Sequence, residues 1–201
     1  MSKSGTISWD CDGVLANFTR AFTRTGHMLF GTPVSDNQAQ KSWMFEDFPE
    51  LNLTKVMCEE IWSLIKTNPF FWSQLDPLNP SLMREINKIS NRIFITNRPG
   101  LDTQLQTKIF LSHWGIENPE VIVAEKKAPV AQHMKVMAHI DDYIVNCREI
   151  KDAIPHAYVA LLSMPYNMEF QAEWLASGGE IVLSADHFMN ECIKRDLIEW
   201  R

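Results

Sequence analysis

Ile7-Ser8-Trp9-Asp10-Cys11-Asp12-Gly13-Val14-Leu15-Ala16-Asn17-Phe18 is the stretch that decides the fold of this chain. Its apolar beginning predicts a strand over Thr6 to Trp9, and Gly13 marks the turn that follows. Asp10 and Asp12 stand at the end of that strand, where buried carboxylates repel each other unless a cation lies between them. Mg²⁺ prefers oxygen ligands and meets that need. Because open α/β sheets bind ligands beyond the C-terminal ends of their strands, this turn is a candidate active site, with a chance loop as the alternative.

Strand-like and helix-like segments alternate over most of the chain, which predicts an α/β fold with a Rossmann-like parallel sheet flanked by helices. We expect further strands at Arg92 to Thr96, Val121 to Ala124, Val136 to Ile140, Ala157 to Leu162 and Ile181 to Leu183. We expect helices from Pro80 (with Asn79 as the cap), at Asp102 to Trp114, Ala128 to Lys135, Met168 to Ser177 and Asp186 to Trp200.

One stretch interrupts this alternation. Two helices, Leu15 to about Thr25 and Leu53 to Thr67, follow the first strand with polar and aromatic sequence between them, and no strand pattern separates them. We therefore predict a small helical cap, residues 18–75, inserted into a core made of residues 1–17 and 76–201.

Three later segments place polar or charged residues just after a predicted strand or before a helix. Thr96-Asn97-Arg98 offers a hydroxyl, backbone amides and a cation for phosphate oxygens, although an ordinary strand-to-turn transition explains the same residues. Lys126-Lys127 precedes a helix and could neutralise the charge of aspartate and phosphate, or could be a solvated surface pair. Asp141-Asp142 ends an apolar strand and again calls for a cation, with helix capping as the alternative.

The pattern Asp-x-Asp-Gly-Val-Leu, followed in order by Thr96, a lysine and Asp-Asp, resembles the four motifs of the haloacid-dehalogenase-like (HAD) hydrolases. The resemblance implies that Asp10 is a nucleophile that takes the phosphoryl group and that Asp12 is the general acid and base. It implies that Thr96 binds the transferred phosphoryl group. It also implies that a lysine neutralises the negative charge of the aspartate and the phosphate, and we favour Lys127 over Lys126 for this role.

The same resemblance implies a Mg²⁺ site. The side chain of Asp10 and the backbone carbonyl of Asp12 would share the ion with Asp141 and Asp142, one of which binds directly while the other acts through water or by orienting Lys127.

A closer resemblance is to the pyrimidine deoxyribonucleotidases, whose first motif also continues Leu-Ala-x-Phe. It implies that Phe18, Trp43 and Phe45 contact the substrate, although aromatic residues are more often part of a core. Two departures concern the second motif, Thr96-Asn97-Arg98 in place of a Thr-Ser-Pro-like sequence, and Tyr143, which stands where a basic residue is usual. Asn97 and Arg98 are accordingly candidate phosphate or substrate contacts.

The composition limits the kinds of partner, metal site and cellular location to expect. The chain has 201 residues, a formal net charge of −6 and four widely spaced cysteines, which argue against a nucleic-acid-binding surface and a structural zinc site. No signal peptide or membrane-length apolar run is present, so we expect a cytoplasmic protein, in the host cytoplasm if the chain is viral. The expected partner is a small phosphate ester, a nucleotide by resemblance, without membrane or stable nucleic-acid binding; a homodimer is left open.

The expected function is a Mg²⁺-dependent phosphatase that forms an aspartyl-phosphate and acts on 5′-mono(deoxy)nucleotides. A phosphatase for sugar phosphates or other small phosphoesters is the first alternative. A non-catalytic nucleotide-binding or interaction module is the second, and cleavage at a nucleic-acid end is the third.

Overall fold

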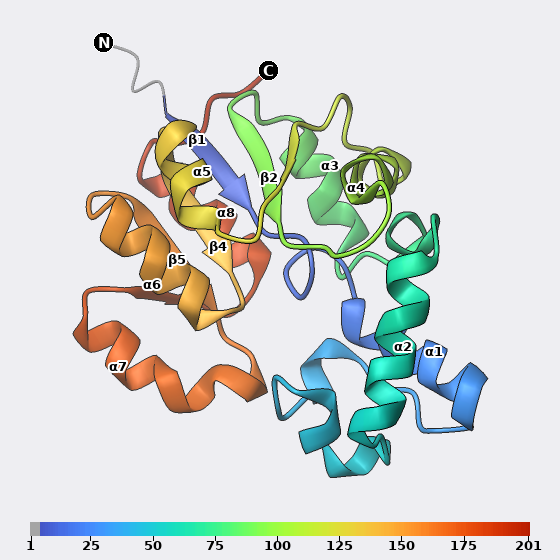
Figure 1. The fold of residues 1–201 in the computed structure, drawn as a ribbon. Coiled ribbons are helices and arrows are strands. Elements are labelled where there is room, and N and C mark those ends of the chain that lie inside the picture. Colours follow the sequence, from blue (N-terminus) through green and yellow to red (C-terminus); the bar gives the residue numbers. More distant parts are fainter. Residues whose placement is uncertain (1–4) are drawn as a thin grey trace.

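The structure, a computed structural model, describes residues 5–201 and is built around one six-stranded sheet (Figure 1). Its strands are β1 (Thr6–Trp9), β2 (Arg92–Thr96), β3 (Val121–Val123), β4 (Val136–Asp141), β5 (Tyr158–Leu162) and β6 (Glu180–Val182). They run parallel in the order β3-β2-β1-β4-β5-β6. The predicted α/β fold with a parallel sheet flanked by helices is therefore confirmed.

Eight α-helices accompany the sheet in the described part of the chain. They are α1 (Phe18–Phe30), α2 (Lys55–Thr67), α3 (Pro80–Asn87), α4 (Thr103–His113), α5 (Lys127–His133), α6 (Ile144–Ala153), α7 (Gln171–Ala176) and α8 (Ala185–Lys194). Short 3-10 helices lie at Asn37–Ala39, Phe45–Asp47, Pro49–Leu51, Phe71–Gln74 and Pro165–Phe170. Among residues 5–201, none of the helices is long and apolar enough to cross a lipid bilayer.

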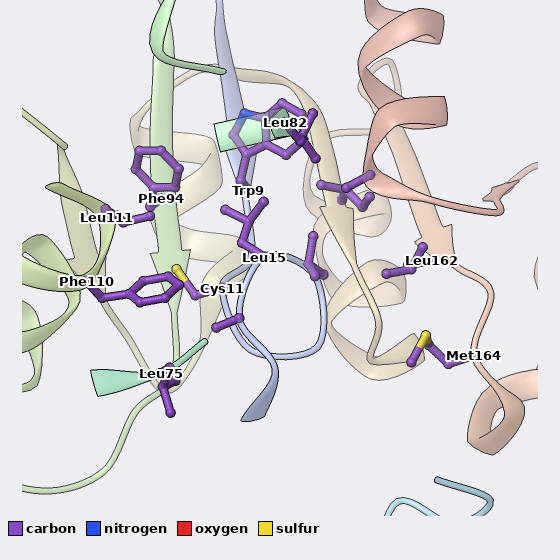
Figure 2. Packing of buried hydrophobic residues seen from close by; sticks show 14 of the residues in the cluster. Trp9, Cys11, Leu15, Leu75, Leu82, Phe94, Phe110, Leu111, Leu162 and Met164 are labelled. Carbon is purple, nitrogen blue, oxygen red and sulfur yellow. The ribbon is translucent and has the colours of Figure 1, made fainter. Parts of the chain in front are cut away.

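Two apolar layers cover the two faces of the sheet. On one face Trp9 of β1 and Phe94 of β2 pack with the buried sides of α3, α4 and α8, and Figure 2 shows both rings in the same layer as Phe110 and Leu82. Residues of α5, α6 and α7 cover the other face. Because both faces are buried, the strands are mostly apolar, and the polar residues Thr96 and Asp141 stand at the C-terminal ends of β2 and β4. Ser8 and His139 are polar residues inside β1 and β4, and they are buried and hydrogen-bonded to each other.

The register of the central strands decides where those polar ends meet. Trp9 of β1 pairs with Phe94 of β2 on one side and with Ile140 of β4 on the other. One residue further, the backbone N–H of Asp10 donates to the carbonyl of Ile140 at 3.1 Å. The C-terminal ends of β1, β2 and β4 therefore lie side by side, although they are far apart in the sequence.

The segment predicted as a cap leaves and rejoins the core at one place. The backbone N–H of Asn17 donates to Asp76 O at 2.8 Å, and that of Leu78 donates to Leu15 O at 2.8 Å. Between these points α1 and α2 pack together away from the sheet, at the lower right of Figure 1. The chain thus enters and leaves this segment at neighbouring points of the core, as in an inserted unit. Residues 18–75 are called the cap below.

Several element boundaries differ from the predictions. Helix α1 begins at Phe18, because the side chain of Asn17 accepts a hydrogen bond from the N–H of Arg20 and caps the helix there. The predicted Met168 to Ser177 helix is instead a 3-10 helix followed by the short α7, and α8 ends at Lys194 well before Trp200. Helix α6 was not predicted at all.

Candidate active site

A pocket of about 490 Å³ opens beyond the C-terminal ends of β1, β2 and β4 and is closed on its far side by the cap. Of the site residues predicted from the sequence, all except Arg98 line it: Asp10, Asp12, Phe18, Trp43, Phe45, Thr96, Asn97, Lys127, Asp141 and Asp142. The strand ends thus bring together residues from four separate parts of the sequence.

Three carboxylates form a compact cluster in this pocket. One oxygen from each of Asp10, Asp141 and Asp142 lies within 4.8 Å of the other two, and all three residues are buried. Lys127, at the start of α5, donates from Nζ to Asp10 and, at 2.7 Å, to Asp141. Its side chain is buried, whereas its neighbour Lys126 is exposed at the rim. The cluster of acids could hold a metal ion, and Lys127 is the lysine that contacts it.

The pKa values show that one lysine does not balance the three acids. Burial raises the pKa of Asp10 to about 7, against the opposing charge of Lys127 and with the added repulsion of Asp141. Burial and the charges of Asp10 and Asp141 raise the pKa of Asp142 well above its ordinary value. Burial would raise the pKa of Asp141 as well, but Lys127 and the hydrogen bond with His139 hold it below its ordinary value. A divalent cation would supply the missing positive charge, so this donor set fits a hard ion such as Mg²⁺.

Asp142 is held by the turn of the first motif and by a tyrosine. The hydroxyl of Tyr166 donates to Asp142 Oδ2, and the side-chain amide of Asn167 donates to Asp142 O at 2.9 Å. Gly13 has φ +81°, in the left-handed region, and a Cβ added there would overlap the carboxylate of Asp142. A glycine is therefore required at this position both for its backbone conformation and for the close approach of Asp142.

The end of β2 presents an unpaired hydroxyl to the pocket. Oγ1 of Thr96 is buried and has no hydrogen-bond partner among the described residues. Asn97, the next residue, is exposed and lines the same pocket. Because a buried hydroxyl without a partner is costly, Thr96 is suited to receive a ligand oxygen.

Asp12 makes a different set of contacts from the acid cluster. Arg98 donates to it from Nε at 2.9 Å and from Nη2 at 2.6 Å, in a two-pronged ion pair. The guanidinium also donates to Thr107 Oγ1 at 2.9 Å and lies over the ring of Trp72, 5.0 Å from its centre. Arg98 is fully buried behind Asp12, so it is placed to orient that carboxylate from the side away from the pocket.

The cap supplies a wall of aromatic rings. Phe18 stacks on Trp62, with centroids 5.5 Å apart, and on Trp72 at the same distance. Trp43 reaches back to the core, where its ring stacks on Tyr143 with the centroids 4.3 Å apart. Phe45 packs on Phe22 and is the most buried of the three aromatic residues predicted to contact substrate.

Sequence reasoning missed several residues of this site. Tyr166 and Asn146, which donates to Asp141 at 3.1 Å, both hold acids of the cluster, and Trp62 and Trp72 line the pocket. Asn146 could have been found from the 3.6-residue spacing of the buried residues of α6, which would have placed a helix directly after Asp142. No sequence signal identifies Tyr166 as a partner of Asp142.

Comparison with known proteins gives matches of fold but not of sequence. No family model and no curated protein match the sequence. A HAD family hydrolase from Deinococcus radiodurans R1, whose crystal structure has bound phosphate and sodium, matches with a TM-score of 0.58 at 10% identity, over 98% of this chain and 98% of that one. A hydrolase from Pseudomonas syringae matches with a TM-score of 0.53 at 13% identity, over 94% of this chain and 98% of that one. This chain has the α/β fold of those two hydrolases.

Proposed function

We propose that this protein is a Mg²⁺-dependent phosphomonoester hydrolase of the HAD superfamily, which forms an aspartyl-phosphate on Asp10. The observation that carries the proposal is the convergence of Asp10, the unpaired hydroxyl of Thr96 and the buried Lys127 in one pocket. A nucleophile, a donor for phosphate oxygens and a fixed cation are the minimum that phosphoryl transfer requires.

The residues of the chain have separate roles in the proposed reaction. A carboxylate oxygen of Asp10 attacks phosphorus while the bond from phosphorus to the leaving oxygen breaks, and Asp12 gives its proton to that oxygen. Asp12 then takes a proton from water, which attacks the aspartyl-phosphate and releases inorganic phosphate, so that Asp10 is restored. Thr96 and Lys127 bind phosphate oxygens in both steps, and Arg98 keeps Asp12 oriented.

Asp10, Asp141 and Asp142 would hold the Mg²⁺ ion, with the resemblance adding the backbone carbonyl of Asp12. When bound, the ion would neutralise phosphate charge as a Lewis acid. The deficit of positive charge in the cluster supports this assignment, since burial and mutual repulsion raise the pKa of both Asp10 and Asp142.

We propose a nucleoside monophosphate as the substrate. The partly exposed rings of Phe18, Trp43 and Trp62 line the cap side of the pocket with apolar surface suited to a nucleobase. The volume of about 490 Å³ lies within the range of ordinary small-molecule sites, roughly 300 to 1,000 Å³. The Deinococcus hydrolase of the same fold has bound phosphate, which agrees with the phosphate part of this proposal and not with any choice of leaving group.

A panel of phosphomonoesters with and without Mg²⁺ tests the proposal. We expect hydrolysis of nucleoside monophosphates that stops when a chelator removes the metal and returns when Mg²⁺ is added. Asp10→Asn should lower kcat by about 10⁴-fold or more while leaving the circular dichroism spectrum unchanged. Asp152→Asn, an equivalent change at an exposed position of α6, is the matched control and should retain full activity.

Two outcomes would contradict the proposal. Unchanged turnover in Asp10→Asn would exclude the covalent mechanism. Equal or faster hydrolysis of sugar phosphates would retain the phosphatase but exclude the nucleotide preference.

A further inference from the structure

Three buried polar side chains form a connected group on the cap wall of the pocket. Thr19, Asn37 and Gln40 are 1%, 2% and 5% exposed, and all three line the pocket. The backbone N–H of Thr19 donates to Asn37 Oδ1 at 3.0 Å, and the hydroxyl of Thr19 donates to Gln40 Oε1 at 2.5 Å. Buried polar groups are normally paired, so each donor and acceptor of this group can be accounted for.

Thr19 and Gln40 use all of their side-chain polar atoms within the protein. Besides accepting from Thr19, Gln40 donates from Nε2 to Ser42 O at 2.8 Å. Asn37 is different. Its side-chain oxygen accepts a hydrogen bond from the backbone N–H of Thr19. Its Nδ2 has no hydrogen-bond partner among residues 5–201, and the protein does not fully enclose this nitrogen atom.

The orientation of the Asn37 carboxamide is fixed by this arrangement. A backbone N–H can only donate, so the atom of Asn37 that faces Thr19 must be the oxygen and the amide cannot be flipped. The part of Asn37 left for the pocket is therefore an NH₂ group, a pure donor. Such a group selects ligands that offer it an acceptor, because a ligand without one leaves the donor desolvated and unpaired.

The surroundings of Asn37 narrow the kind of acceptor. The same pocket presents the stacked rings of Phe18 and Trp62, and these apolar surfaces favour a flat ring over a flexible polyol. A flat ring offers in-plane acceptors, namely a carbonyl oxygen or a ring nitrogen. A hydrogen bond made in a pocket that is partly lined by apolar rings also has less competition from water.

We propose that Asn37 is a specificity-determining residue, which donates a hydrogen bond from Nδ2 to a carbonyl oxygen or ring nitrogen of a ring on the leaving group. The inference rests on the proposed phosphatase function and deepens it, because it names the group that recognises the part of the substrate remote from phosphorus. Asn37 takes no part in the bond-breaking steps.

The experiment compares two substrates of the same shape, thymidine 5′-monophosphate and its difluorotoluene isostere, in which fluorine replaces the two ring carbonyl oxygens and carbon replaces the ring N–H. We expect the wild type to prefer thymidine 5′-monophosphate in kcat/KM by about 5- to 100-fold. Asn37→Leu should remove most of that preference by slowing the thymidine ester while the isostere is hydrolysed as before. Gln38→Leu, at an exposed position of the same 3-10 helix outside the pocket, is the matched control and should keep the preference.

A second variant protects the test against misfolding. Asn37→Asp keeps an oxygen for the N–H of Thr19 but removes the donor, so it should also lose the preference. Equal losses on both substrates in the two variants, or no preference in the wild type, would overturn the proposal.

Failure of the proposed function would be seen separately. It would appear as absence of hydrolysis of every ester by the wild type, including phenyl phosphate, which carries no ring acceptor. Calorimetric titration with thymidine and its difluorotoluene analogue would then still decide the role of Asn37, because binding requires no chemistry. Tighter binding of thymidine that disappears in Asn37→Asp would support the proposal, and equal binding of the two would overturn it.

Discussion

The two walls of the pocket are built in opposite ways. On the core side, Asp10 and Asp141 are buried charges at strand ends, and Lys127 at the start of α5 forms ion pairs with both. On the cap side, Phe18 and Trp43 are partly exposed rings on an inserted segment. Under the proposed function, this difference corresponds to a division of labour, in which the sheet would fix the reacting groups and the cap would select the leaving group. Variants of the core wall should therefore change kcat for every substrate, and variants of the cap wall should change KM for some.

Apart from the loss of the nucleophile itself in Asp10→Asn, the largest effect is expected from Lys127→Met, which removes the cation shared by Asp10 and Asp141. Loss of charge balance at the phosphoryl group should lower kcat by about 10²- to 10³-fold. Breaking a buried ion pair also costs roughly 3 to 5 kcal/mol, so the free energy of unfolding should fall, and urea denaturation measures it.

Lys126→Met is the matched control for that prediction, because this lysine is adjacent but exposed at the pocket rim. It should change kcat by no more than about 3-fold, as expected for a solvent-screened charge. A greater loss in Lys126→Met than in Lys127→Met would contradict the charge assignment on the core wall.

A smaller and more selective effect is expected from Arg98→Ala, which releases Asp12 from its two-pronged ion pair. If Arg98 orients the group that protonates the leaving oxygen, kcat should fall by about 100-fold for alkyl phosphates. It should fall far less for p-nitrophenyl phosphate, whose leaving group needs no proton. Arg98→Lys keeps the positive charge but cannot donate to both oxygens of Asp12 as the planar guanidinium does. Its kcat should show the same dependence on the leaving group, with a smaller loss.

Arg92→Lys tests whether substitution of another buried arginine, at the first position of β2, gives the same result. This residue lies at the opposite end of the strand, outside the pocket. Its substitution should lower stability without a dependence on the leaving group. A uniform loss across substrates in Arg98→Ala would show that Arg98 is only structural.

The two walls also differ in how far the sequence predicted them. The apolar run before Asp10 and the strand Arg92–Thr96 were predicted correctly, as was Asn79, whose side chain caps α3 by accepting from the N–H groups of Ser81 and Leu82. Since parallel strands end at one edge of a sheet, predicting the strands was enough to predict that Asp10 and Thr96 would lie in one pocket. The roles of these residues remain predictions.

Side-chain partners made by long-range contacts could not be predicted in this way. Arg98 was expected to reach phosphate or substrate but pairs with Asp12, 86 positions away, and Tyr166 pairs with Asp142 across 24 positions. Both residues lie outside regular strands, where periodicity does not set the direction of a side chain. The cap residue Asn37 likewise carries no pattern, because its orientation depends on one hydrogen bond from Thr19.

On the cap wall, Phe18→Leu should raise KM for nucleoside monophosphates by about 10-fold, since it breaks the stack with Trp62 and Trp72 that shapes the apolar wall of the pocket. It should leave KM for methyl phosphate unchanged, because that ester has no ring. Phe22→Leu is the matched control: Phe22 is buried on the same helix, outside the pocket, and its substitution should lower thermal stability but not raise KM. An equal rise in KM for both esters in Phe18→Leu would indicate a general loss of cap structure.

The smallest effect should come from the contact that joins the two walls. Trp43 of the cap stacks on Tyr143 of the core with the planes 20° apart, so the pair holds the cap against the core at the pocket. Trp43→Ala should raise KM about 3-fold, in keeping with an aromatic pair worth roughly 0.5 to 1.5 kcal/mol. Tyr143→Ala should have a similar effect, and the double variant should be no worse than Trp43→Ala, because Trp43→Ala already removes the stack with Tyr143 as well as the edge contact with Tyr166. Additive effects in this cycle would mean that the two rings act independently, and that other contacts between cap and core, such as the hydrogen bond from Trp72 Nε1 to Pro99 O at 3.1 Å, hold the cap.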